Sequence, residues 1–87
     1  MNIQNNTKTA TAPRSISTIA YEIRRLWRPV NYAAAPYLNA MMSLDRITDQ
    51  FYADSGRSVV LYFLSNAASW RGDDARRIKA ELKAMLK

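Results

Sequence analysis

Apolar side chains recur at three- and four-residue spacing through much of this chain, and this periodicity constrains its fold more than any other feature. The first periodic segment follows Ser15 or Ser17, either of which can cap a helix through its hydroxyl oxygen. It stops before Pro29, which disfavours helical geometry at the preceding residue. We therefore expect a first amphipathic helix. Its apolar arc consists of Ile16, Ile19, Ala20, Ile23, Leu26 and Trp27.

A second helix is expected from Pro36 to about Tyr52. Proline suits an early helical position, because its missing N–H would have no partner there. The predicted apolar face contains Tyr37, Ala40, Met41, Leu44, Ile47, Phe51 and Tyr52. Leu38 and Met42 fall off this arc, so they either reach another helix or are exposed.

The segment from Val59 to Leu64 is apolar without interruption. Its β-branched and aromatic residues would also suit a strand, but no second strand is found to pair with it. Because a lone strand leaves its backbone groups unsatisfied, we interpret the segment as a helix over about 56–69, capped by Asp54 or Ser55. A helix that is apolar nearly all round is expected in the middle of a bundle.

The tripeptide Trp70-Arg71-Gly72 separates this helix from the last one. We expect Trp70 to pack beneath the turn and Gly72 to supply its tight or left-handed geometry. Asp73 and Asp74 then place carboxylates at the positive end of the final helix. The residues that this helix is expected to bury are Ala75, Ile78, Leu82, Met85 and Leu86.

Together these segments predict an all-α fold, a small four-helix bundle formed by residues 14–87 as a single domain. A chain of 87 residues allows only one small domain. Residues 1–13 are rich in Asn, Thr and Ala and have no apolar periodicity, so they are expected to form a flexible tail. They also lack the apolar core of a signal peptide. No apolar run approaches the ~20 residues that span a bilayer, so we predict a cytoplasmic protein with no membrane partner.

The composition argues against catalysis. The chain has no cysteine and no histidine, which excludes thiolate metal sites and the usual partner of a serine nucleophile. It also contains no P-loop, GxGxxG or GxSxG motif. Asp45, Asp49 and Asp54 could together hold Mg²⁺, but an acidic pair four residues apart is common on exposed helices, and Asp54 already has a capping role. We therefore expect no catalytic residue, no metal and no cofactor.

Positive charge is the best indication of a partner. Thirteen basic and seven acidic residues give a formal net charge of +6, which favours acidic partners. On the last helix, four basic residues share one flank, while Asp74 and Glu81 lie on the opposite flank. Such a stripe can contact a phosphate backbone or an acidic protein surface, although an ordinary solvated face would look the same. The stripe consists of Arg76, Lys79, Lys83 and Lys87.

A second basic cluster surrounds Trp27 and is followed by Tyr32. Arginines beside aromatic residues suit base stacking and bidentate phosphate contacts, but Trp27 lies on the apolar arc and is assigned to the core. Arg71 is expected to be exposed beside Trp70. The predicted partner-binding residues are thus Arg24, Arg25, Arg28, Arg71, Arg76, Lys79, Lys83 and Lys87.

Two long phrases, PYLNAMMSLDRI and SGRSVVLYFLSNAASWRGDDARRIKAELKAML, carry a resemblance to uncharacterised small helical proteins of bacterial phages and mobile elements. The resemblance covers well over half of the chain but not its first thirty residues. It brings no catalytic motif. It implies a small accessory protein in phage–host conflict or in the maintenance of a mobile element.

From these observations we expect a non-enzymatic binding protein that blocks an acidic protein surface or a nucleoprotein complex. In a phage setting, the sharpest form of this hypothesis is an inhibitor of a host defence system, such as an anti-CRISPR protein. The alternative is a sequence-tolerant DNA- or RNA-binding protein that uses its basic helix faces. Leu38, Met42 and the aromatic residues would also support a homodimer, although a monomer would use the same residues internally.

Overall fold

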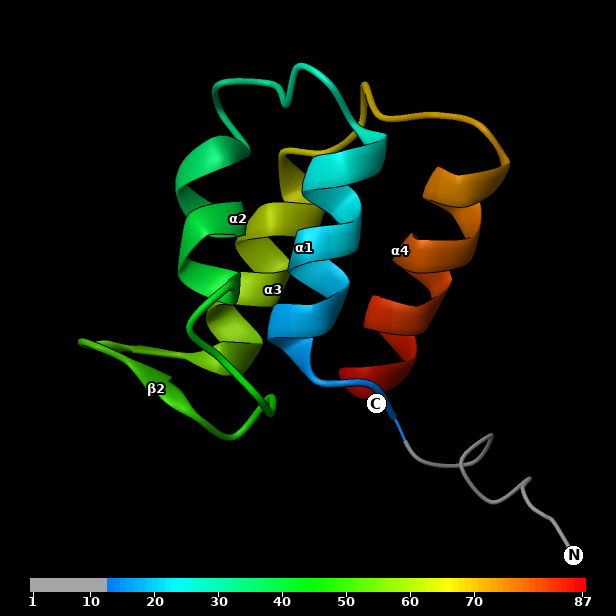
Figure 1. Ribbon diagram of the computed structural model, residues 1–87. Helices are drawn as coiled ribbons and strands as arrows, with labels where there is room; N and C mark the ends of the chain where they lie inside the picture. The colour runs from blue at the N-terminus through cyan, green and yellow to red at the C-terminus, as the bar shows by residue number, and fades with distance from the viewer. Residues whose placement is uncertain (1–12) are drawn as a thin grey trace, which may run out of the picture.

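The computed structural model describes residues 13–87, in which four helices surround an apolar core and a short hairpin projects at one end (Figure 1). The predicted tail over residues 1–13 lies, apart from Pro13, outside the described residues. The elements in chain order are α1 Ile16–Leu26, α2 Ala35–Met41, β2 Gln50–Phe51, β3 Asp54–Ser55, α3 Gly56–Ser65 and α4 Asp73–Met85.

Helix α1 confirms the first predicted helix. Ser15 caps it, because its Oγ accepts a hydrogen bond from the N–H of Thr18 at 3.1 Å. The helix ends at Leu26, before Pro29. Its four central apolar residues, Ile16, Ile19, Ala20 and Ile23, are completely buried.

The second predicted helix is wrong beyond Met41, where α2 ends. The chain turns there because its backbone carbonyls cap α1. Leu44 O accepts from the N–H of Ser17 at 2.7 Å, and Asp45 O accepts from the N–H of Ile16 at 3.0 Å. The first amides of a helix have no partner within that helix, so these contacts satisfy groups that would otherwise be unpaired.

A carboxylate keeps the following segment out of helical geometry. Asp49 Oδ2 accepts from the N–H groups of Asp45 and Arg46 at 3.0 and 3.1 Å. Aspartate competes with helical hydrogen bonding in this way, because its short side chain reaches nearby backbone donors. The predicted acidic pair of Asp45 and Asp49 on one helix face is therefore also wrong.

The hairpin of β2 and β3 stands where the end of the second helix was expected. It is antiparallel, with Gln50 opposite Ser55 and Phe51 opposite Asp54. Gly56 follows immediately, and a Cβ atom there would lie 2.7 Å from the carbonyl oxygen of Arg46, so only glycine allows this close approach. The hairpin is thus fastened against the preceding turn.

Helix α3 confirms the helical interpretation of the apolar run, with Ser55 as its cap. It ends at Ser65, short of the predicted residue 69. The expectation of an interior helix is wrong on one face, since Leu61 and Tyr62 are 45% and 49% exposed.

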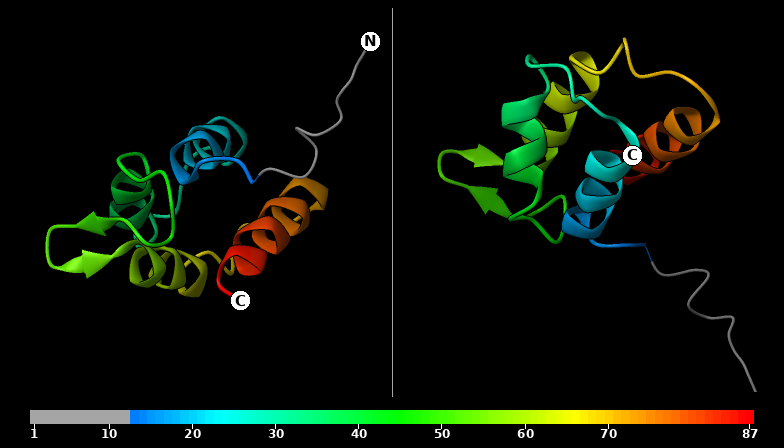
Figure 2. Two further views of the ribbon diagram at one scale, coloured as in Figure 1. Left: turned by 90° about the horizontal axis from the view of Figure 1, so that it is seen from below. Right: turned by 45° about the horizontal axis from the view of Figure 1, so that its top comes forward.

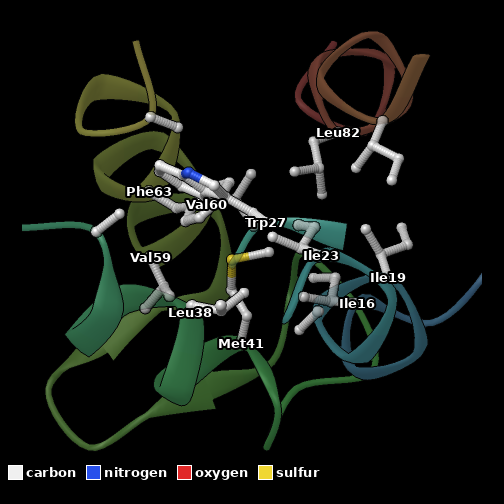
Figure 3. Packing of buried hydrophobic residues seen from close by; sticks show 14 of the residues in the cluster. Ile16, Ile19, Ile23, Trp27, Leu38, Met41, Val59, Val60, Phe63 and Leu82 are labelled. Carbon is white, nitrogen blue, oxygen red and sulfur yellow. The ribbon is translucent and has the colours of Figure 1, made fainter. Parts of the chain in front are cut away.

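One continuous core joins all four helices and their connectors (Figure 3). Leu38, which the periodicity left unassigned, is completely buried in it. Trp27 and Trp70 are also buried, and their rings stack at 5.5 Å with an interplanar angle of 11°. Both tryptophans are therefore structural, as predicted. Of the apolar residues expected from α4, Met85 and Leu86 are only partly buried.

The connectors 27–34 and 66–72 lie together at one end of the molecule, which we call the loop end (Figures 1 and 2). A hydrogen bond of 3.4 Å from Asn31 Nδ2 to Ser69 Oγ joins them. The chain runs toward this end in α1 and α3 and away from it in α2 and α4. None of the helices within residues 13–87 has the length and apolar character needed to cross a membrane.

Candidate basic interface

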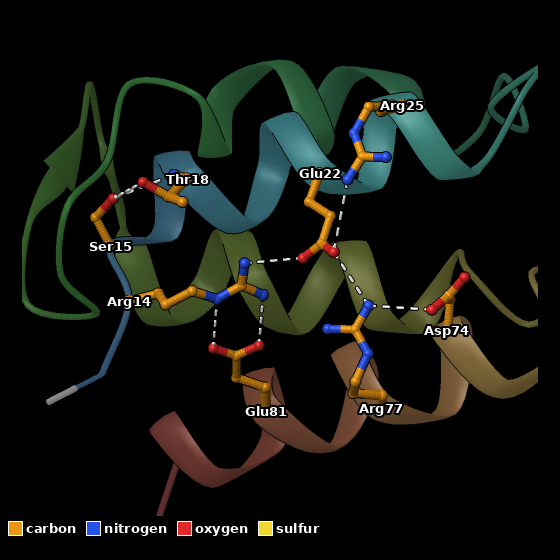
Figure 4. A network of polar contacts seen from close by, with 8 residues as sticks. All are labelled: Arg14, Ser15, Thr18, Glu22, Arg25, Asp74, Arg77 and Glu81. Carbon is orange, nitrogen blue, oxygen red and sulfur yellow. Dashed lines mark hydrogen bonds and ion pairs between the residues drawn. The ribbon is translucent and has the colours of Figure 1, made fainter. Parts of the chain in front are cut away.

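Five charged residues join α1 to α4 in what we call the ion-pair face (Figure 4). Glu22 is at its centre, 2.8 Å from Arg14 and 3.1 Å from Arg77. Arg14 also donates two hydrogen bonds to Glu81, at 2.7 and 2.9 Å, and Arg77 reaches Asp74 at 3.1 Å. The helical pattern predicted an acidic flank on α4. This flank faces α1, and its two carboxylates, Asp74 and Glu81, form ion pairs with Arg77 and Arg14.

The electrostatics of this face favour its charged state. Hydrogen bonds from Arg77 and Arg14 lower the pKa of the Glu22 carboxyl, against the opposing effect of its burial. The pKa of each arginine is raised in return, mainly by its carboxylate partner. Neither Arg14 nor Arg77 was among the predicted site residues; the i,i+3 spacing of Asp74 and Arg77 is a local signal for one pair, but no local pattern links either arginine to Glu22. Only their distance to Glu22 reveals this structural role.

The predicted basic stripe on α4 divides into two kinds of residue. Arg76 forms an ion pair with Asp73, one turn earlier. Lys79 is half-buried, and its Nζ donates a hydrogen bond to Trp70 O at 2.7 Å. Lys83 and Lys87 are exposed, and neither has a carboxylate within ion-pair distance among residues 13–87. The stripe available to a partner is therefore narrower than predicted.

Lys79 nevertheless belongs to a cluster of like charges. Burial lowers the pKa of its ammonium group, and the positive charges of Lys83 and Arg71 lower it further. This effect requires Lys83 and Arg71 to lie near Lys79. The structure thus brings together Arg71 from the connector and two lysines from α4, as part of the predicted interface.

The predicted arginines of α1 also differ in their surroundings. Arg25 reaches Glu22 at 3.8 Å and so belongs to the edge of the ion-pair face. Arg24 donates a hydrogen bond to Asn39 Oδ1 on α2. Arg28 follows the helix, is exposed and has no carboxylate within ion-pair distance in the described part of the chain.

Arg24 and Arg28 line an open cleft at the loop end, with a volume of about 660 Å³. Among residues 13–87, these two arginines are the only charged residues in its wall. The remaining wall is mostly apolar and consists of Trp27, Pro29, Val30, Ala35 and Leu38. A second cleft, of about 480 Å³, contains Asp45 beside Arg14 and Arg46, so its charges are mixed.

The stacked tryptophans place two Trp-Arg dipeptides side by side. Trp27 precedes Arg28, and Trp70 precedes Arg71. Since the two rings are in contact, the arginines that follow them extend from neighbouring points of the loop end. From the sequence, the two dipeptides were interpreted separately. Their repetition in the connectors that follow α1 and α3, the two helices that run toward the loop end, was the signal that could have linked them.

The carboxylates considered for Mg²⁺ do not converge. Asp49 is engaged by the backbone amides of Asp45 and Arg46, and Asp54 lies in β3. Across residues 13–87, no three side chains of the kinds that ligate metals are close enough to hold an ion together.

In comparisons with known proteins, no family model matches this chain, and neither a curated protein nor a solved structure matches it significantly. The resemblance to phage and mobile-element proteins therefore stays an expectation. The interface has to be interpreted from its own geometry.

Proposed function

We propose that this protein is a small non-enzymatic binding protein that acts by covering an acidic macromolecular partner, either a protein surface or a nucleoprotein complex. The observation that carries this proposal is the uneven pairing of its charges. Three of its carboxylates, those of Glu22, Asp74 and Glu81, are engaged with arginines on the ion-pair face. Basic residues elsewhere on the surface have no carboxylate partner within residues 13–87. They include Arg28, Arg71, Lys83 and Lys87.

This positive charge favours an anionic partner on physical grounds. Burial lowers the pKa of the Lys79 ammonium group, and the nearby positive charges of Lys83 and Arg71 lower it further, so an anion placed beside Lys79 would stabilise its charge. A positively charged surface also accelerates the encounter with a negatively charged partner. Since salt screens such contacts, binding should weaken as the salt concentration rises.

The biological setting follows only from the resemblance to phage and mobile-element proteins. In that setting the partner would be part of a host defence system, and an anti-CRISPR protein is the sharpest form of the proposal. Binding alone would be sufficient for such a role, because a bound protein excludes whatever normally occupies the covered surface.

A second candidate function is sequence-tolerant binding of DNA or RNA. The observation that favours it is the position of Tyr32, which is 89% exposed and follows Arg28 by four residues. Exposed aromatic rings beside arginines are typical of proteins that stack on bases and contact phosphates.

The proposal is tested by titrating the purified protein with a single-stranded oligonucleotide, a DNA duplex and poly-glutamate at low salt, and then at increasing salt. We expect tight low-salt binding to at least one of them. Lys83→Gln should lower the slope of log affinity against log salt for an oligonucleotide by about 1, whereas the exposed control Arg46→Gln should not. Stronger binding to poly-glutamate supports the acidic-protein form, and stronger binding to nucleic acid supports the second candidate. Absence of binding to all three polyanions contradicts both.

A further inference from the structure

The loop-end cleft combines two properties that point to a particular ligand chemistry. Within the described part of the chain, its charged residues are Arg24 and Arg28, and no carboxylate lines it. Arg24 is already oriented by its hydrogen bond to Asn39, while Arg28 is exposed beside it. Guanidinium groups bind phosphate and carboxylate oxygens through paired N–H donors, so this side of the cleft suits an anion.

The other side of the cleft is apolar. Its exposed and partly exposed residues are Pro29, Val30 and Ala35. The lining also includes Trp27 and Leu38, which are buried in the core, so this surface is held in place by the packing beneath it. A free phosphate or another small inorganic ion would leave this surface uncovered. The cleft therefore favours a ligand that carries a planar or apolar group next to its anionic group.

Positive and aromatic groups continue from the cleft across the loop end. Tyr32 is 89% exposed on the connector that follows Arg28. Arg71 is exposed next to Trp70, whose ring stacks on Trp27 of the cleft. A ligand with several anionic groups in succession can therefore contact Arg28 and Arg71 in turn, with the ring of Tyr32 available for stacking.

We propose that the loop-end cleft binds single-stranded nucleic acid, with a phosphate at Arg24 and Arg28 and an unpaired base against the apolar wall. This inference rests on the proposed function, because it names the chemistry that one part of the basic surface recognises. A duplex fits less well, since its bases are paired and stacked with one another and cannot cover the apolar wall. Binding is expected to tolerate many sequences, because every base has a planar face.

The test uses tryptophan fluorescence, because Trp27 lines the cleft and Trp70, the second of the two tryptophans of the chain, stacks on it. The protein is titrated with a twelve-residue oligothymidylate, the matching duplex and poly-glutamate. We expect the single strand to change the emission and to bind more tightly than the duplex. The double variant Arg28→Gln with Tyr32→Ala should lower the affinity for the single strand by at least about tenfold.

A matched control removes the same two kinds of side chain elsewhere. Arg46 and Tyr21 are both exposed, and neither lines the loop-end cleft, so Arg46→Gln with Tyr21→Ala should leave most of the affinity intact. Circular-dichroism melting of both variants establishes that they fold. The single variant Arg28→Lys keeps the charge but loses the paired donors, and it should bind more weakly than the unmodified protein.

The outcomes separate this inference from the proposed function. If the single strand binds but the two double variants lose affinity equally, or if the emission does not change, the cleft inference is wrong while a basic interface remains. Saturable binding of poly-glutamate that only the cleft variant weakens would identify an acidic peptide as the ligand and overturn the inference. If none of the three probes binds at low salt, the proposed function fails together with it.

Discussion

The ion-pair face and the loop end are both rich in arginine, yet their arginines have opposite surroundings. On the ion-pair face, Arg14 and Arg77 each contact two carboxylates. At the loop end, Arg28 and Arg71 are exposed and lie beyond ion-pair distance of every carboxylate in residues 13–87. The first set joins helices, and the second set is available to a partner.

This difference teaches that net charge alone does not locate an interface in a small basic protein. Half-buried carboxylates such as Glu22 recruit arginines into the structure, and those arginines no longer attract a ligand. Arg28 and Arg71, which pair with no carboxylate of residues 13–87, lie at the loop end instead. Each of the following predictions alters one of the two regions and measures whether the other responds.

The largest expected effect comes from Trp70→Ala, which removes one ring of the stack that holds the loop end. Trp70 is 6% exposed, and loss of a buried tryptophan costs about 3–5 kcal/mol. Urea unfolding should therefore show a large fall in the free energy of unfolding. Because such a loss can unfold a domain this small, Trp70→Phe provides a milder variant with a smaller decrease. If both variants were as stable as the unmodified protein, the stack would not be what holds the loop end.

Glu22→Gln should have the next largest effect, and it acts on the ion-pair face. The substitution removes the charge that holds Arg14 and Arg77, and hydrogen bonds between such charged groups contribute about 1.5–3 kcal/mol. We expect a stability loss of about 2 kcal/mol in urea unfolding. Affinity for polyanions should not decrease, since no cation is lost. A decrease in that affinity would show that the two regions are not separate.

The dependence of stability on pH should reveal the same carboxyl. Its pKa lies below the ordinary value of 4.5 in the folded protein, so the unfolded chain takes up the proton first as the pH falls. The stability that this group contributes is fully present above pH 4.5 and is lost as the pH falls through the lower folded value. Melting temperatures measured across this range should fall less steeply for Glu22→Gln. Part of the pH dependence should remain in this variant, because two backbone N–H groups also lower the pKa of Asp49.

The smallest effects distinguish two neighbouring lysines of α4. Lys79→Met removes the hydrogen bond to Trp70 O and should cost about 1 kcal/mol. Lys83→Met removes an exposed side chain and should change the stability by less than about 0.5 kcal/mol. In polyanion titrations, Lys83→Met should flatten the salt dependence. If Lys83→Met proved the more destabilising of the two, the division of the stripe would be wrong.

Regular helical periodicity allowed α1 and α4 to be predicted, and α3 was predicted from an uninterrupted apolar run that follows a capping serine. The error over residues 42–52 arose where the pattern still looked helical. There, Leu44 and Asp45 direct their carbonyls to the start of α1, and Asp49 binds the local amides. Contacts between segments far apart in the chain leave no periodic trace in the sequence.

The candidate site was predictable only in part. The exposed positions of Arg28 and Arg71 followed from the helix boundaries at Pro29 and Gly72. The pairing of Arg76 with Asp73 was also within reach of the sequence, since the two residues lie three apart on one helix. The hydrogen bond from Lys79 to Trp70 O spans a turn whose geometry no local pattern specifies.

The sequence by itself determined the positions of α1, α3 and α4, most of the apolar residues that these helices bury, and that the chain carries excess positive charge. These properties depend on the spacing and chemistry of residues that are close together in the sequence, so each helix can be analysed by itself. The tertiary structure decided which cations are neutralised and which are free, and it formed the loop-end cleft from the end of α1 and the start of α2. Electrostatic pairing depends on distances of a few ångströms between residues as far apart in the chain as Arg14 and Glu81, and only the packed helices set those distances.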